Sequence, residues 1–192
     1  MRYSLPFMLV LSCLFLGCTS DTPSADTADQ TESSADSADS PLTGVAEVDV
    51  LVDEPSGSNP VTWGIALDQP TATPGGTVQL VVRAKIADPW HIYAVEGPVG
   101  VGRPTKFELT LPTGVSAGEW TLPDAIVESS SLGEISSYHH DVLFSVPLEI
   151  GEAAASGDQT IGCKVQFQAC TNESCRPPTS TELSASLTVA AK

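Results

Sequence analysis

Two cysteines near the end of the chain have the residue type and spacing for thiol chemistry. Cys170 and Cys175 are separated by the polar residues 171–174 and are closely followed by Pro177 and Pro178. The polar residues predict a tight hairpin turn after Cys170. Such a turn brings two Cα atoms to the separation of about 4.4 to 6.8 Å that a disulfide requires. A ring of this size contributes only about 2 kcal/mol to stability, so the disulfide is a candidate for opening and closing in use.

The elements that must position this hairpin are strands, because apolar residues after residue 60 recur with a period of two. The alternating stretches are 61–67, 78–86, 107–111, 142–150, 161–167 and 183–189. Gly, Pro and Asn separate them, and no window shows a competing helical period. Each of these strands has one apolar face, which a second sheet must cover. The pattern therefore predicts an all-β, immunoglobulin-like antiparallel β-sandwich. A weaker alternation at 45–52 is consistent with a first edge strand.

A third cysteine, Cys163, precedes the hairpin on the same predicted strand. It shares the apolar face with Val165 and Phe167, whereas Cys170 follows the polar parity of Lys164. A buried free cysteine behaves as a small hydrophobic residue. We therefore expect Cys163 to lie in the core, outside the redox site.

The N-terminus has the features of a secretory signal. An apolar run from Leu5 to Leu16 is too short to span a bilayer and ends in Gly17 and Cys18. The last five residues of this segment, 14–18, resemble the bacterial lipobox, which implies that Cys18 is acylated and becomes the mature N-terminus. We expect residues 1–17 to be a lipoprotein signal peptide and the protein to be lipid-anchored on the periplasmic side of the cell envelope.

Residues 18–60 have the composition of a tether. They repeat Ser-Ala-Asp and Thr-Ala-Asp triplets and contain no Lys or Arg. Such a segment cannot form a core and repels itself, so we expect a disordered linker that holds a domain, residues 61–192, away from the membrane.

The composition and several weak motifs exclude other functions. The net charge is −16, and the basic residues are too few and too scattered to form a patch for nucleic acid. The segment Gly114-Val115-Ser116-Ala117-Gly118 matches the nucleophile elbow of esterases, but the strand and helix that an elbow requires are not predicted around it. His139 and His140 are adjacent and so point to opposite faces of a strand, and the cysteine spacing lacks a second pair. We expect neither a metal nor a cofactor.

Three blocks of sequence form a more specific pattern. They are DPWHIYA at 88–94, YHHDVLFSVPL at 138–148 and QACTNESCRPP at 168–178. In this order they resemble the aromatic strand, the Val-Pro-Leu strand and the cysteine hairpin of the N-terminal periplasmic domain of the DsbD thiol:disulfide interchange protein. The resemblance covers most of residues 61–192.

The resemblance implies an immunoglobulin-like carrier that accepts reducing equivalents from a membrane-embedded cysteine donor and passes them to thioredoxin-fold proteins outside the cytoplasm. Cys170 and Cys175 map onto the reactive pair, with Cys175 bonding to partners and Cys170 resolving the mixed disulfide. His91 and Tyr93 map beside the pair, where their rings would shield the sulfurs and Tyr93 would supply a hydroxyl. The alternative for both is ordinary core packing.

This sequence departs from the family at two points. Where the family has a loop that places an aromatic ring over the disulfide, residues 128–133 offer only Leu132. The chain also ends after the domain, so the electron donor is expected on a separate chain. The rival interpretation is a structural or binding sandwich whose disulfide only tightens a hairpin; such a bridge typically has a reduction potential below about −300 mV.

Overall fold

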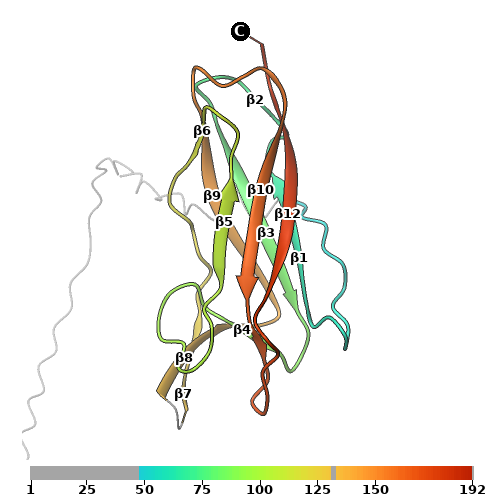
Figure 1. Cartoon of the computed structure of the whole chain (residues 1–192), viewed down its shortest axis with the longest axis vertical. Helices are drawn as coiled ribbons and strands as arrows, with labels where there is room; N and C mark the ends of the chain where they lie inside the picture. Colours follow the sequence, from blue (N-terminus) through green and yellow to red (C-terminus); the bar gives the residue numbers. More distant parts are fainter. Residues whose placement is uncertain (1–47, 131–132, 192) are drawn as a thin grey trace, which may run out of the picture. The chain divides into compact units, whose positions relative to one another are not determined.

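The computed structural model describes residues 48–130 and 133–191, and every regular element in these ranges is a β-strand (Figure 1). The all-β prediction is therefore confirmed. The signal peptide at 1–17, Cys18, the linker up to residue 47 and Leu132 lie outside the described residues. No described residue belongs to a helix with the length and apolar character needed to cross a bilayer.

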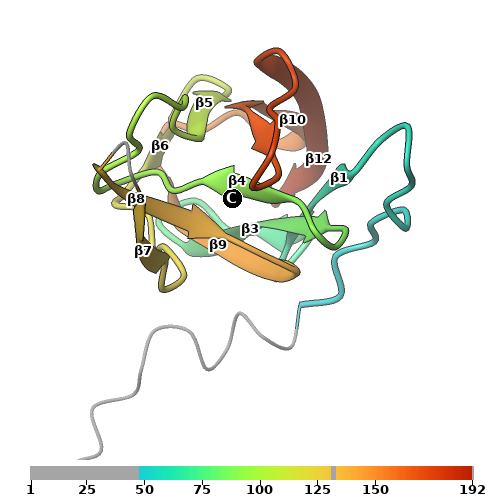
Figure 2. The same cartoon turned by 90° about the horizontal axis from the view of Figure 1, so that it is seen from below.

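Two four-stranded sheets face each other and enclose the core (Figure 2). The first sheet has the order β1 (Val61–Leu67), β3 (Thr77–Ile86), β9 (Asp141–Ile150) and β6 (Val115–Ala117), and all its pairs are antiparallel. The second has the order β2 (Thr71–Ala72), β12 (Thr179–Val189), β10 (Gly157–Phe167) and β5 (Lys106–Thr110). Its pairs are antiparallel except β2 with β12, which is parallel.

A third small sheet lies at the end of the sandwich away from the C-terminus (Figure 1). Its order is β11 (Ala169–Cys170), β4 (His91–Tyr93), β8 (Gly133–Tyr138) and β7 (Ile126–Ser130). This sheet was not predicted from the sequence, because β11 and β4 are too short to show an alternation and β7 and β8 are rich in Ser and Glu and have few apolar residues.

In strand β10, buried and exposed residues alternate as the sequence predicts. Cys163, Val165 and Phe167 are buried, whereas Lys164 and Gln166 between them are partly exposed. The buried face packs against Phe144 of the opposite sheet and against other apolar side chains of the same cluster. Cys163 is 1% exposed, which confirms that it is a core residue.

Residues 48–60, which we call the strap, lie across the outer face of the first sheet. Val50 is 1% exposed and packs against Val81, which is fully buried. The strap passes so close to β1 that a Cβ on Gly64 would lie 2.3 Å from the carbonyl oxygen of Leu51. The Thr62 hydroxyl also donates a 2.6 Å hydrogen bond to the Asp53 carbonyl. Gly64 is therefore required by the close approach of the strap.

The strap changes two sequence-based expectations. Residues 48–52 form no strand, although the alternation at 45–52 suggested one. The packed part of the chain also begins before residue 61, where the composition placed the start of the domain. Val50 and Val52 pack on the sheet and hold this segment in place. Their contribution was not recognised from the sequence because polar residues flank them on both sides.

We predict that Cys163 is chemically inert in the folded protein. Burial, and secondarily Glu182, raises the pKa of the Cys163 thiol from 9.0 to about 12. Iodoacetamide should therefore modify Cys163 in the urea-unfolded chain but hardly in the native protein at pH 8, as mass spectrometry can measure. Rapid native alkylation would contradict the burial.

The same thiol gives a stability prediction. Cys163→Ala should lower the free energy of unfolding by about 1 kcal/mol at pH 7 because sulfur contacts are lost. Above pH 9 the unfolded chain ionises this thiol while the folded chain keeps it protonated. The contribution of Cys163 is thus complete below pH 9 and declines as pH rises. Urea denaturation should show a smaller difference between the two proteins at pH 10 than at pH 7.

Candidate functional site

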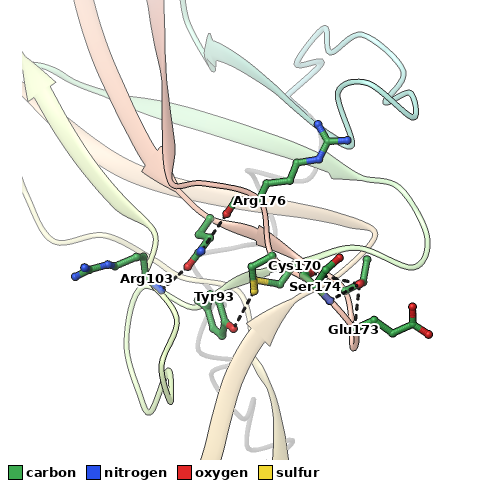
Figure 3. Close-up of a disulfide and its surroundings, with 9 residues drawn as sticks. Tyr93, Arg103, Cys170, Glu173, Ser174 and Arg176 are labelled. Carbon is green, nitrogen blue, oxygen red and sulfur yellow. Dashed lines mark hydrogen bonds between the residues drawn. A yellow bond between two sulfur atoms is a disulfide. The ribbon is translucent and has the colours of Figure 1, made fainter.

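Cys170 and Cys175 form a disulfide across a short hairpin (Figure 3). Their Cα atoms are 4.0 Å apart, somewhat closer than the separation expected from sequence. The backbone explains this distance, because the hydrogen bonds on either side join Thr171 N–H to the Ser174 carbonyl at 2.7 Å and Arg176 N–H to the Ala169 carbonyl at 2.8 Å. Cys170 and Cys175 therefore face each other as a pair without backbone hydrogen bonds between them. At such pairs the backbones of two antiparallel segments approach most closely.

The turn between the cysteines is stabilised by its first residue. The Thr171 hydroxyl accepts hydrogen bonds from the backbone N–H groups of Glu173 at 3.2 Å and Ser174 at 3.1 Å. Threonine hydroxyls commonly bond to the backbone of a following turn in this way. The polar residues that predicted a turn therefore form one.

The two sulfur-bearing residues differ in exposure. Cys170 lies in β11, pairs with His91 of β4 and is only 1% exposed. Cys175 lies beyond the turn and is exposed. Because thiol–disulfide exchange requires the incoming sulfur to reach one sulfur of the bridge, Cys175 is the accessible position.

Tyr93 lies against the exposed residue of the pair. Its hydroxyl is 4.0 Å from Cys175 Sγ, and Tyr93 itself is 6% exposed. The residues after Gly97 form a loop that covers the ring, since a Cβ on Gly102 would lie 2.1 Å from two of the ring atoms. The backbone of Tyr93 is held by Thr105, whose hydroxyl donates a 2.7 Å hydrogen bond to the Tyr93 carbonyl. The ring is thus fixed between this loop and the disulfide.

His91 occupies the next position on the same face of β4. Its ring lies edge-on to Tyr93 at 5.6 Å and 5.4 Å from the ring of His139. Burial, followed by the neighbouring His139, lowers the pKa of His91. His91 is 5% exposed, so it remains neutral at pH 7 and adds aromatic surface but no charge to the site.

Arg176 and Gln168 hold the strand that carries Cys175. The Arg176 guanidinium donates hydrogen bonds to the strap carbonyls of Gly57 at 2.7 Å and Ser58 at 2.8 Å, and lies over the ring of Trp90 at 4.8 Å. The Gln168 side chain donates to the Arg176 carbonyl at 3.0 Å and accepts from the backbone N–H of Arg103 at 3.1 Å. The strap, the hairpin and the loop over Tyr93 are therefore connected.

A groove opens beside Cys175. It has a volume of about 530 Å³ and is lined by His91, Tyr93, the turn 171–174 and residues of the loop and of β7 and β8. Val101 contributes an apolar side chain that is 78% exposed. The groove gives a second molecule access to the sulfur.

The predicted site residues separate into three groups. The structure brings Cys170, Cys175, His91 and Tyr93 together, whereas Leu132 lies outside the described residues. Pro177 and Pro178 line a different groove of about 390 Å³, between the strap and β10. In the described ranges no three His, Cys, Asp or Glu side chains come together as a metal site would require.

Sequence reasoning missed three residues of the site. His139 lies in the turn after β8, not on a strand as assumed, and its ring reaches His91. Gln168 and Arg176 were part of the cysteine motif but had no assigned role. Only the position of Arg176, directly after Cys175, could have drawn attention to it.

Comparisons with known proteins point to one family of domains. Residues 65–187 match the family model described as "Thiol:disulfide interchange protein DsbD, N-terminal". No curated protein matches the sequence. Among solved structures, the N-terminal periplasmic domain of ScsB from Proteus mirabilis aligns with a TM-score of 0.51 and 15% identity over 70% of this chain. The chain spans only about half of that domain, 49%.

Two structures from Neisseria meningitidis are also similar. The reduced DsbD N-terminal domain aligns with a TM-score of 0.41 and 21% identity, covering 57% of this chain and 77% of that one. A complex between the DsbD and PilB N-terminal domains aligns with a TM-score of 0.39 and 18% identity, covering 55% and 73%. The family match extends over most of the sandwich and includes both cysteines of the hairpin. The chain therefore belongs to the family of DsbD N-terminal domains, which function in thiol:disulfide interchange.

Proposed function

We propose that this protein is a thiol–disulfide carrier of the cell envelope that cycles the Cys170–Cys175 disulfide. The observation that carries the proposal is the unequal exposure of the two cysteines, with Cys170 buried and Cys175 exposed beside a groove. A bridge that served only to tighten the hairpin would not need one accessible sulfur. Family membership supports the same activity.

The reaction consists of two exchanges that each move two electrons. In the first, a donor thiolate attacks Cys175 Sγ, the Cys170–Cys175 bond breaks, and Cys170 leaves as a thiolate that takes up a proton. The donor's second thiol then displaces Cys175, so the donor is oxidised and both cysteines are reduced. In the second, the Cys175 thiolate attacks an acceptor disulfide, and Cys170 displaces the reduced acceptor and restores the bridge.

Tyr93 and Arg176 have distinct parts in this cycle. The Tyr93 hydroxyl, 4.0 Å from Cys175 Sγ, is placed to donate a hydrogen bond to the thiolate that forms on reduction. Arg176, through the strap carbonyls, keeps the strand of Cys175 in position when the covalent bridge is open. The reduced hairpin then needs little rearrangement before it closes again.

The proposed partners follow from the family. They are a membrane-embedded cysteine donor on a separate chain and thioredoxin-fold acceptors. A structure is known of the complex between the DsbD and PilB N-terminal domains from Neisseria meningitidis, which provides a precedent for a carrier–partner complex. We further propose that Cys18 carries a lipid and keeps the domain on the periplasmic side of the membrane, with residues 18–47 as its tether.

The first prediction tests the role of each sulfur. Cys170→Ser leaves Cys175 without a resolving thiol, so a mixed disulfide with a thioredoxin-fold protein should accumulate and be visible on a non-reducing gel. Cys175→Ser should trap much less, because the remaining sulfur is buried. The unmodified protein should also equilibrate with reduced thioredoxin at a potential above about −300 mV. If it stays oxidised and neither variant traps a partner, the disulfide is structural.

A second prediction concerns the Tyr93 hydroxyl. In the reduced protein, Tyr93→Phe should slow alkylation of Cys175 by iodoacetamide at pH 7 severalfold. A hydrogen bond to a charged group stabilises it by roughly 1.5 to 3 kcal/mol, and the lower nucleophilicity of a stabilised thiolate offsets about half of the resulting gain in rate. Tyr138→Phe is the matched control, since Tyr138 is also buried, 2% exposed against 6% for Tyr93, but packs against Phe144 in the core. Equal rates in both variants and the parent would show that Tyr93 acts through its ring alone.

A third prediction concerns the anchor. Cys18→Ser should release the protein from the membrane fraction and remove the mass of the attached lipid from the mature N-terminus. Mass spectrometry and fractionation measure both. A Cys18→Ser protein that still sediments with membranes would place the anchor elsewhere.

A further inference from the structure

The basic residues of this acidic protein are unevenly distributed. The chain has 8 Lys and Arg residues against 24 Asp and Glu residues. Arg2 and Lys192 lie outside the described residues, which leaves six. Three of these six are engaged by other groups: Arg83 pairs with Asp141, Lys85 with Glu54, and Arg176 binds strap carbonyls.

The remaining three, Arg103, Lys106 and Lys164, line one groove of about 770 Å³. This basic groove lies on the outer face of the second sheet, because Lys164 and Gln166 alternate with the buried face of β10. Its other lining residues, besides Gln166, are Pro104, Phe167, Pro178, Thr179 and Ser180. Half of the described basic residues of a protein with a net charge of −16 therefore line a single concave surface.

The positive charge is concentrated at one end of the groove. Lys164 has Glu182 at 3.9 Å, and the nearby Glu108 accepts a 2.7 Å hydrogen bond from Gln166. Arg103 and Lys106 are exposed, and neither side chain forms an ion pair with any other residue in the described ranges. The unpaired charge is therefore at the Arg103–Lys106 end.

This end adjoins the reactive hairpin. The backbone of Arg103 bonds to Gln168, whose amide bonds to the carbonyl of Arg176, the residue after Cys175 (Figure 3). Pro178, which lines the groove, is the third residue after Cys175. A protein of ordinary size covers roughly 800 Å² when it docks, which is enough for a partner at Cys175 to extend onto this adjoining surface.

The chemistry of the occupant follows from charge and shape. Two unpaired cations in a groove that also contains Phe167, Pro104 and Pro178 suit a short segment with carboxylates rather than a flat surface. Anionic membranes recruit clusters of about four to eight basic residues. A net charge of −16 opposes binding to a bilayer or to nucleic acid.

We propose that the basic groove binds an acidic segment of the redox partner and orients that partner for attack at Cys175. The proposal rests on the carrier function and adds to it a criterion for partner choice. The basic groove favours a partner that has Asp or Glu beside its reactive cysteine. The rest of the carrier, with its net charge of −16, repels acidic molecules.

The test compares two thiol peptides, Glu-Glu-Gly-Cys and Lys-Lys-Gly-Cys, as reductants of the full chain. In each reaction two peptide thiols are oxidised to a peptide disulfide, and the Cys170–Cys175 disulfide becomes two thiols. At low ionic strength we expect the acidic peptide to react faster than the basic one. The net charge alone predicts the opposite order, so a faster basic peptide would overturn the proposal.

Variants locate the effect. Arg103→Gln combined with Lys106→Gln should lower the ratio of the acidic-peptide rate to the basic-peptide rate about fivefold. This factor corresponds to about 1 kcal/mol, the attraction between two opposite charges in contact in water. In the parent protein, about 0.5 M salt should lower the same ratio by a similar factor. Thr71→Glu with Ser116→Glu is the control, because both positions are exposed on other strands and the net charge changes equally. A ratio that falls equally in the control would show that only the overall charge acts.

A second readout separates the groove from the redox reaction. The thiol-free peptide Glu-Glu-Gly-Ser should shift the amide NMR signals of Lys106, Phe167 and Ser180 in the oxidised chain. If neither thiol peptide reduces the disulfide, the proposed carrier function is wrong. The NMR shifts would still support binding of an acidic segment in the basic groove. If the shifts are absent, that binding proposal is wrong. Shifts caused by phosphatidylglycerol vesicles and not by the peptide would assign the groove to a membrane and overturn the proposal.

The chain's own acidic N-terminal segment is the remaining competitor. Changing Asp26, Asp29, Asp36 and Asp39 to Asn in the full chain should leave the peptide response unchanged. If the acidic peptide binds only to this variant, the groove belongs to residues 19–47 of the same chain, and the partner proposal is wrong.

Discussion

The pairing of β11 with β4 is the interaction on which the candidate site depends. It joins only Ala169 and Cys170 to Ile92 and His91, yet it decides which sulfur is buried. With Cys170 held in a sheet, the turn must carry Cys175 outward, and the alternation of β4 places His91 and Tyr93 on one face beside it. The different accessibility of two otherwise identical thiols therefore arises from backbone pairing.

A covalent bridge that opens cannot be the only support of its own hairpin. In this protein the support comes from noncovalent contacts that do not involve sulfur. Arg176 spans from the hairpin to the strap and Trp90, and Gln168 connects the same strand to the loop over Tyr93. Each contact is formed by a residue of the cysteine motif that lies just outside the disulfide ring, Gln168 or Arg176. Breaking the S–S bond removes none of these contacts, because none of them involves a sulfur atom.

The long strands could be predicted from sequence because their two faces differ in polarity over many residues. This holds for β10, where Cys163 and Val165 were assigned to the core by parity alone. The third sheet could not be predicted, since β11 has two residues, β4 has three, and β7 and β8 are rich in Ser and Glu and lack a regular apolar face. The cysteine pair was found by spacing and family resemblance, whereas His139 and Arg176 act through contacts between segments far apart in sequence. Such contacts leave no local periodicity.

The position of the strap has a practical consequence for anyone who isolates the domain. A chain cut at residue 61 would start where the composition changes, but it would leave Val81 and the bare backbone at Gly64 without their cover. Apolar surface uncovered next to the edge strand β1 invites sheet-to-sheet association between molecules. The same cut would take away the two carbonyls that receive Arg176, so aggregation and a loosened hairpin would arise together from one misplaced boundary.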